Sequence, residues 1–214
     1  MIVTAQKPLD EILGFISPYD GDILIAGCDG CTQPPRGIKE AETLGQLLEL
    51  GGKLGNKNFT FKTITVAKQC DIYLAESVVE PQIEGMEAVL SLACGIGVQT
   101  LAGLFPELAV FPTQNTHFMG AEDREAGILE EMCSGCGECR LALTGGICPV
   151  TRCTKGLLNG QCGGSKNGKC ELSPDKDCGW VLIYEALKRQ GKLDNLKEFQ
   201  PPRNFQLADW RITT

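Results

Sequence analysis

Short apolar runs alternate with amphipathic stretches along the first half of the chain. The run DILIAGC at 22–28 is continuously apolar, as expected of a strand buried on both faces of a sheet, and it stops at Gly27-Cys28. The following segment, 37–54, carries apolar residues at helical spacing and ends in glycines. The pattern therefore predicts a buried strand followed by a helix.

The same order of strand and helix recurs further along the chain. The expected later strands are 59–70, 86–95 and one near 109–112, and the helices between them are 72–79 and 98–105. Strands that alternate with helices in this rhythm indicate parallel βαβ units. We therefore expect the fold class to be α/β, with an N-terminal Rossmann-like parallel sheet in a domain over residues 1–118.

The segments flanking this region have other patterns. Residues 1–20 predict an amphipathic helix ended by Ser17-Pro18, and the acidic stretch 117–132 predicts a helical linker. A second domain over 119–214 is expected to be Cys-rich, with a terminal helix near 180–193. The tail after it, which carries Phe205 and Trp210, is expected to dock on its own domain or on a partner.

The chain contains twelve cysteines, which require a chemical explanation. The N-terminus has neither a basic region followed by an apolar core nor a small-residue cleavage site, so we expect a cytoplasmic protein without disulfides. No stretch approaches the roughly 20 apolar residues that a membrane span requires. Metal ligation is then the leading interpretation of the cysteines.

The net charge of −7 and the isoelectric point near 4.9 argue against nucleic-acid partners. Such partners are bound by clustered lysines and arginines, whereas the basic residues here are scattered. With His117 as the single histidine, the sequence does not indicate a Ser/His/Asp hydrolase site, and no phosphate-binding glycine motif is complete.

The strongest chemical signal is CSGCGECRLALTGGICP. It places Cys133, Cys136 and Cys139 at intervals of three, followed by Cys148 directly before a proline. Closely spaced thiolates between small residues resemble the ferredoxin run that holds an iron-sulfur cubane. Ferredoxins have three residues before the Cys-Pro pair and this chain has eight, so the identity of the fourth ligand stays open.

The cysteines that follow lack this tight spacing. They are Cys153, Cys162, Cys170 and Cys178. Eight C-terminal thiols are enough for two cubanes, or for one cubane and a tetrahedral zinc site. Some of them can also be small buried hydrophobic residues.

The N-terminal cysteines form a possible third site. Cys28, Cys70 and Cys94 each follow or end a predicted strand, and Cys31 completes a C-x-x-C turn with the first of them. Because ligands of open α/β sheets bind beyond the carboxyl ends of the strands, these thiols are expected to converge. A third cluster is one interpretation, and a thiol-disulfide pair at Cys28 and Cys31 is another.

The segments GCDGCTQPPRG, LACGIGVQT and CGECRLALTGGICPVTRCTKGLLNGQCGG carry a resemblance to a known family. Over about residues 22–180 the chain is similar to the iron-sulfur subunit associated with methylenetetrahydrofolate reductase in acetogenic bacteria. The C-terminal part of that subunit corresponds to the reductase's C-terminal family. The resemblance implies that the cysteines from Cys133 to Cys178 are ligands, and members of the family are described as binding zinc as well as iron-sulfur clusters.

The resemblance also implies a function. A separate flavin-containing catalytic subunit would reduce methylenetetrahydrofolate in one-carbon metabolism, in the Wood-Ljungdahl pathway of anaerobes, and this chain would bring it electrons without being catalytic itself. Two or three 4Fe–4S clusters are then expected, with zinc as the alternative to one C-terminal cluster. The upstream donor would be ferredoxin or a nicotinamide-linked module. A zinc-stapled structural subunit and a thiol-based oxidoreductase remain as alternatives.

Overall fold

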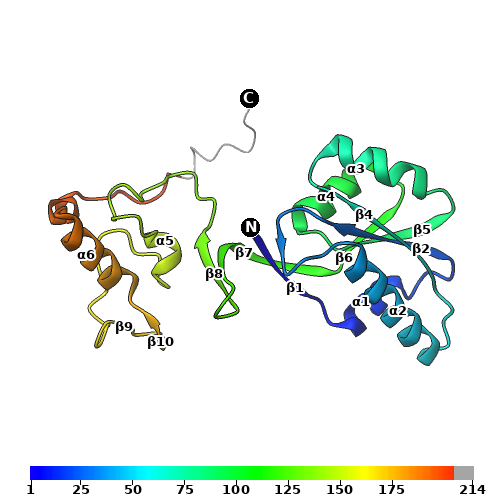
Figure 1. The fold of residues 1–214 in the computed structure, drawn as a ribbon, viewed down its shortest axis with the longest axis horizontal. Coiled ribbons are helices and arrows are strands. Elements are labelled where there is room, and N and C mark those ends of the chain that lie inside the picture. Colours follow the sequence, from blue (N-terminus) through cyan, green and yellow to red (C-terminus); the bar gives the residue numbers. More distant parts are fainter. Residues whose placement is uncertain (205–214) are drawn as a thin grey trace. The chain divides into compact units, whose positions relative to one another are not determined.

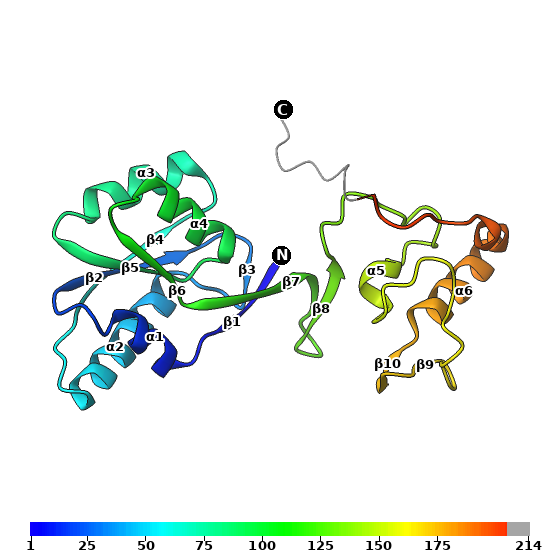
Figure 2. The ribbon, with the colours of Figure 1, turned by 180° about the vertical axis from the view of Figure 1, so that it is seen from behind.

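The computed structural model describes residues 1–204 of the chain (Figures 1 and 2). The chain divides into two compact units, Met1–His117 and Phe118–Thr214. The tail with Phe205 and Trp210, for which docking is expected, lies outside the described residues. Within residues 1–204, every helix is too short or too polar to cross a lipid bilayer.

The N-terminal unit is built on a parallel sheet with the strand order β4-β2-β5-β6. Its strands are β2 (Asp22–Cys28), β4 (Thr60–Val66), β5 (Met86–Ser91) and β6 (Ala109–Pro112). The predicted α/β class with a parallel sheet is therefore confirmed. Two strands end earlier than expected, which leaves Cys70 and Cys94 in the loops that follow β4 and β5.

Helices cover both faces of this sheet (Figure 1). They are α1 (Leu9–Ile16) and α2 (Ile38–Leu54) on one face, and α3 (Ile72–Val79) and α4 (Gly95–Leu104) on the other, with the short helix η1 (Glu80–Gln82) after α3. Along β2, Ile23 and Ile25 pack in the first layer and Leu24 and Ala26 in the second. Successive strand residues point to opposite faces, so a continuous apolar run is what a sheet covered on both sides requires.

The expected helix over residues 1–20 is wrong for its first part. Residues 2–6 form the strand β1 (Ile2–Gln6), which pairs in parallel with β3 (Thr32–Gln33). The Gln6 side-chain amide also donates to the carbonyl oxygen of Thr113 (3.0 Å). The β-branched residues of IVTAQ favour a strand, and Pro8, whose φ is fixed, marks where the helix can begin.

The expected helical linker over 117–132 is also wrong. The segment forms an antiparallel hairpin of β7 (Gln114–Asp123) and β8 (Ile128–Cys133). In the turn, the Asp123 carboxylate accepts the Ala126 N–H (3.2 Å), and Gly127 adopts a positive φ of 65°. Aspartate and glycine are suited to these turn conformations, and their local chemistry overrides the helical preference of the surrounding Glu and Ala residues.

The rest of the C-terminal unit consists of short elements and loops. Its elements after β8 are α5 (Pro149–Arg152), β9 (Lys169–Cys170), β10 (Ser173–Asp177), α6 (Gly179–Gln190) and η2 (Leu193–Lys197). The buried cluster in this unit consists of Trp180, Ile183 and Leu187 on α6. Such a small core leaves the Cys-rich loops dependent on other interactions for their stability.

A pair of glycines on α4 gives a test of the packing on the N-terminal sheet. A methyl group added at Gly97 would lie 2.6 Å from the Cβ atom of Ala93 and 2.9 Å from that of Gln69, whereas one added at Gly103 would meet nothing within 4 Å. Gly97→Ala is expected to lower the free energy of unfolding by about 1–3 kcal/mol because the added methyl overpacks the core. Gly103→Ala is expected to raise it by up to about 1 kcal/mol, since alanine favours helix. Thermal unfolding followed by circular dichroism measures both; equal effects would contradict the packing described.

Candidate functional site

Cysteines of the N-terminal unit lie at the carboxyl edge of the parallel sheet. Cys28 is the last residue of β2 and is buried, and Cys94 is buried directly before α4 begins. Cys70 is exposed in the turn between β4 and α3. Because parallel strands end at the same edge, residues from distant parts of the sequence meet there. The edge thus holds thiols that are 42 and 24 residues apart along the chain.

The electrostatics of Cys70 reflects these neighbours. Burial raises the pKa of the Cys70 thiol, the Lys68 ammonium lowers it, and the thiols of Cys94 and Cys28 raise it. The Cys70 side chain therefore lies within electrostatic range of those of Cys94 and Cys28. Cys31 is exposed in the loop after β2, where its carbonyl oxygen accepts the N–H of Ile2 (2.8 Å).

Gln69, the residue before Cys70, is fully buried and braces this edge. Its side-chain nitrogen donates to the carbonyl oxygens of Ala26 (2.8 Å) and Gly27 (2.7 Å). Its side-chain oxygen accepts the hydroxyl hydrogen of Ser91 (2.7 Å). One side chain thus ties the loop of Cys70 to the ends of both β2 and β5.

The same hydrogen-bond network extends from Gln69 through Ser91 to the backbone beside Cys94. The Ser91 hydroxyl oxygen accepts the N–H of Ala93 (3.3 Å), the residue before Cys94. The backbone beside Cys28, Cys70 and Cys94 therefore belongs to one hydrogen-bond network. Sequence reasoning missed Gln69, and the signal available for it was a polar residue adjacent to a cysteine at a strand end.

In the C-terminal unit, cysteines from separate loops line one small pocket of about 20 Å³. They are Cys153, Cys162, Cys170 and Cys178, and we call this place the four-cysteine pocket. Sequence spacing had left the grouping of the eight C-terminal thiols open. The geometry separates these four from the thiols of the C-x-x-C-x-x-C segment.

The helices α5 and α6 bring the first and last of these cysteines together. Cys153 directly follows α5 and Cys178 directly precedes α6. Gly179, the residue after Cys178, packs against the backbone of Arg152, the residue before Cys153. A methyl group added at Gly179 would lie 2.7 Å from the carbonyl carbon of Arg152. Only a residue without a side chain fits this approach, so Gly179 is part of how the pocket is built.

Hydrogen bonds attach the β9–β10 hairpin to the same place. The N–H of Cys178 donates to the carbonyl oxygen of Gly168 (2.7 Å), directly before β9. The sulfur of Cys170 on β9 lies 3.8 Å from the hydroxyl oxygen of Thr154, the residue after Cys153. The pocket is therefore closed by contacts that link α5, β9 and α6.

Hydrogen bonds at the pocket favour the ionised forms of Cys170 and Glu171. Backbone N–H donation from Leu172, followed by the Thr154 hydroxyl, lowers the pKa of the Cys170 thiol. The Glu171 carboxylate pairs with Lys155 and accepts from the sulfur of Cys162 (3.6 Å). This hydrogen-bonded pairing with Lys155 also lowers the pKa of Glu171. Sequence reasoning missed this ion pair.

The remaining C-terminal thiols follow the β7–β8 hairpin. Cys133 ends β8 and Cys148 directly precedes α5. The Thr151 hydroxyl on α5 donates to the carbonyl oxygen of Met132 (3.3 Å), which holds α5 against the end of β8. Cys136 and Cys139 lie in the loop between, half-buried and exposed respectively.

The fit of these thiols to a metal can be judged from their arrangement. Within residues 1–204, no group of three or more His, Cys, Asp or Glu side chains is arranged around a single metal ion. Zinc holds its sulfur ligands at about 2.3 Å, so four thiolates around one ion must lie almost in contact. The donor set of the four-cysteine pocket is chemically suited to zinc or to a cubane, which both take thiolates.

Comparison with known proteins bears on the C-terminal part of the chain. Residues 111–206 match the family described as "Methylene-tetrahydrofolate reductase C terminal". No curated protein and no solved structure matches the chain. The matched region contains every cysteine from Cys133 to Cys178, and residues 22–110, where a resemblance was also expected, lie outside it. The C-terminal part of this chain, residues 111–206, is therefore similar to the methylene-tetrahydrofolate reductase C-terminal family.

Proposed function

We propose that the chain is an iron-sulfur electron-transfer subunit that delivers electrons to the flavin of a partner methylenetetrahydrofolate reductase. The observation that carries the proposal is the four-cysteine pocket, which gathers thiols from loops spread over 26 residues. The family match supports a reductase as the partner. On this proposal, the N-terminal unit is a Rossmann-like module and the C-terminal unit an iron-sulfur module.

The residues have distinct roles in this proposal. Cys153, Cys162, Cys170 and Cys178 would hold one centre. A second would be held by Cys133, Cys136, Cys139 and Cys148, and a third by Cys28, Cys31, Cys70 and Cys94. When bound, such clusters supply one-electron transfer at potentials set by hydrogen bonds and solvent exposure.

The chain's own groups would tune and protect these sites. Gln69 fixes the backbone beside the N-terminal thiols, while Thr154 and the N–H of Leu172 stabilise the Cys170 thiolate. A reducing cytoplasm keeps such thiols available as ligands. The electron donor would be ferredoxin or a nicotinamide-linked module, and the pathway the methyl branch of one-carbon metabolism.

A zinc-stapled structural subunit is the second candidate function. It is favoured by the small volume of the four-cysteine pocket, 20 Å³, and by the Cys₄ donor set that structural zinc prefers. In that case the pocket would order the reductase complex without carrying electrons. A thiol oxidoreductase at Cys28 and Cys31 is a further alternative.

Metal analysis of anaerobically purified protein tests these functions. The electron-transfer proposal expects about eight to twelve irons per chain, or about four per cluster, with matching acid-labile sulfide. It also expects an electron paramagnetic resonance signal after dithionite reduction. Near-zero iron with about one zinc per chain would overturn it in favour of the structural subunit. Metal-free protein with a redox-active Cys28–Cys31 pair would support the thiol oxidoreductase.

A further inference from the structure

An ion pair lines the four-cysteine pocket beside one of its thiols. The Lys155 ammonium pairs with the Glu171 carboxylate, and an oxygen of the same carboxylate lies 3.6 Å from the sulfur of Cys162. Lys155 comes from the turn after α5, and Glu171 comes from the turn between β9 and β10. Three separate segments of the chain therefore bring a cation, an anion and a sulfur together.

The backbone at Gly164 leaves room for this carboxylate. A methyl group added at Gly164 would overlap the Glu171 carboxylate and lie 3.0 Å from its Cβ atom. Glu171 also directly follows Cys170 on β9, which fixes where its side chain begins. The side chains of Lys155 and Glu171 are both partly exposed, so salt in the solvent screens their charges to some extent.

The second basic side chain of the pocket has other partners. Among the described residues that line the pocket, Arg152 and Lys155 are the basic ones. The Arg152 guanidinium donates to both carboxylate oxygens of Glu130 and lies 3.7 Å from the sulfur of Met132. Lys155 is therefore the cation of the lining that is paired beside the thiols.

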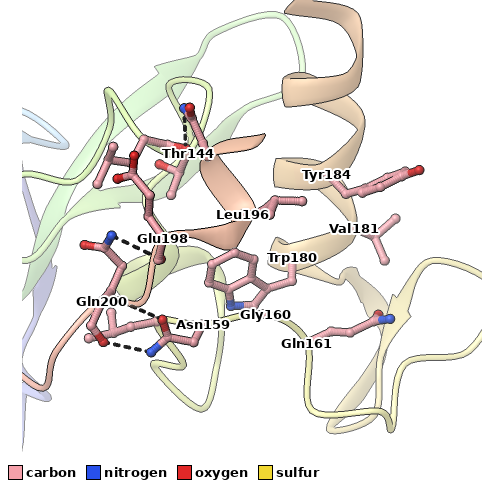
Figure 3. A pocket seen from close by; sticks show the side chains of 13 residues that line it. Thr144, Asn159, Gly160, Gln161, Trp180, Val181, Tyr184, Leu196, Glu198 and Gln200 are labelled. Carbon is pink, nitrogen blue, oxygen red and sulfur yellow. Dashed lines mark hydrogen bonds between the residues drawn. The ribbon is translucent and has the colours of Figure 1, made fainter. Parts of the chain in front are cut away.

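The wall formed by Trp180 and Gln161 supplies no charge to the thiols. These two residues, labelled in Figure 3, line both the four-cysteine pocket and a neighbouring cavity of about 350 Å³. The indole N–H of Trp180 donates to the carbonyl oxygen of Leu157 (2.9 Å), and the Gln161 side-chain oxygen accepts the hydroxyl hydrogen of Ser165 (3.1 Å). Among the described residues that line the larger cavity, Glu198 is the charged one, so that cavity brings no cation to the thiols.

The charge of a metal-loaded pocket gives this ion pair a role. A divalent zinc ion or an oxidised cubane held by four thiolates has a net charge of about −2. The Glu171 carboxylate beside Cys162 adds a further negative charge, and like charges this close repel each other. A cation paired with the carboxylate offsets the repulsion without becoming a ligand.

The electrostatics of Lys155 agrees with this arrangement. The hydrogen bond to Glu171 is the main cause that raises the pKa of Lys155, burial lowers it, and the charge of the Cys162 sulfur raises it. Because the interaction is mutual, the ammonium also favours the thiolate form of Cys162, which is the form that binds a metal.

We propose that Lys155 is the counter-charge of the four-cysteine pocket and determines how firmly a bound metal is held there. Its ammonium offsets the Glu171 carboxylate and the Cys162 thiolate together. Lys155 is thus a positioning residue, because it acts on the metal through these two groups. The inference rests on the proposed function in that the pocket holds a metal, and it applies to iron and to zinc alike.

Metal release from the full chain tests the inference. Anaerobically purified protein is mixed with a chelator of iron or zinc, and the kinetic phase that is absent from Cys170→Ser is assigned to the pocket. Lys155→Met keeps the length of the side chain without its charge and is expected to release this metal about tenfold faster. Lys155→Arg is expected to stay near the parent rate. High salt is expected to narrow the gap between Lys155→Met and the parent, because it screens the repulsion.

Two further variants separate the effect of charge from loss of structure. Adding Glu171→Gln to Lys155→Met is expected to recover most of the parent rate, because the anion that the ammonium offsets is gone. Lys166→Met is the matched control, since Lys166 is exposed and carries the same charge but does not line the pocket. It is expected to release metal at the parent rate.

The outcomes for Lys155 and for the proposed metal site are distinguishable. Release at the parent rate in Lys155→Met would overturn the inference alone. A gap that salt leaves unchanged, or a double variant as fast as Lys155→Met, would overturn it as well, because the ion pair would then only fasten the loops together. A parent chain that holds no more metal than Cys170→Ser would overturn both the inference and the metal site on which it rests.

Discussion

Cys170→Ser is expected to remove one complete metal centre and, with it, much of the stability of the C-terminal unit. Cys170 is a member of the four-cysteine pocket, and its hairpin is attached there by the Cys178 N–H. The buried core of this unit centres on Trp180, Ile183 and Leu187, which is too small to hold its loops alone. On the proposed function a bound metal would contribute the rest, and apparent binding energies of structural zinc reach about 10–16 kcal/mol.

The measurement is metal and sulfide per chain, together with circular dichroism of the intact protein. Ser165→Ala is the matched control, because Ser165 lines the same pocket and its hydroxyl bonds to Gln161 (3.1 Å), but it is not a thiol. It is expected to retain the full metal content. Unchanged metal in Cys170→Ser would mean that the pocket is not a metal site.

Double variants test whether the C-terminal cysteines divide as the geometry indicates. Residues that hold one centre act as a unit, so Cys170→Ser combined with Cys178→Ser is expected to lose no more metal than either alone. Cys170→Ser combined with Cys136→Ser is expected to lose two centres. Additive losses within the pocket would contradict the division.

The sequence was informative where burial alone determines the structure. The continuous apolar run of β2 has to be covered on both faces, and its alternating residues enter the two helical layers as a parallel sheet requires. It was misleading at 117–132, because glutamate and alanine favour a helix over most of that stretch. There the turn formed by Asp123 and Gly127 decided the outcome locally.

The grouping of thiols could not be derived from spacing. Cys153 and Cys178 are 25 residues apart, and what brings them together is the close approach of Gly179 to the backbone of Arg152. Glycines stand next to several cysteines in this sequence, so the glycine at 179 does not by itself predict which distant segment packs against it. The role of Gln69 was hidden for the same reason, since its partners lie up to 43 residues away.

Gln69→Leu is expected to lower the stability of the sheet edge around the N-terminal thiols by about 3 kcal/mol or more. Leucine keeps most of the side-chain volume but removes the donor to the Gly27 carbonyl oxygen and the acceptor of the Ser91 hydroxyl hydrogen. The Ala26 carbonyl oxygen also loses the Gln69 donor but keeps the N–H of Leu92 (2.9 Å). A buried polar group that loses its hydrogen bond costs about 1–3 kcal/mol. Hydrogen exchange of β2 and β5 amides in the intact chain measures the effect, because it reports local stability in a protein with two units.

Gln99→Leu is the matched control, since Gln99 is exposed on α4 and bonds only within its own helix, to the Gly95 carbonyl oxygen (2.9 Å). Its effect is expected to stay within about 0.5 kcal/mol. Adding Ser91→Ala to Gln69→Leu should cost less than Ser91→Ala alone, because the hydroxyl it removes has already lost its acceptor. Two outcomes would contradict this role of Gln69: fully additive effects of Gln69→Leu and Ser91→Ala on stability, or unchanged hydrogen exchange in Gln69→Leu. Gln69 would then only fill space at this edge, without holding in place the backbone beside Cys28, Cys70 and Cys94.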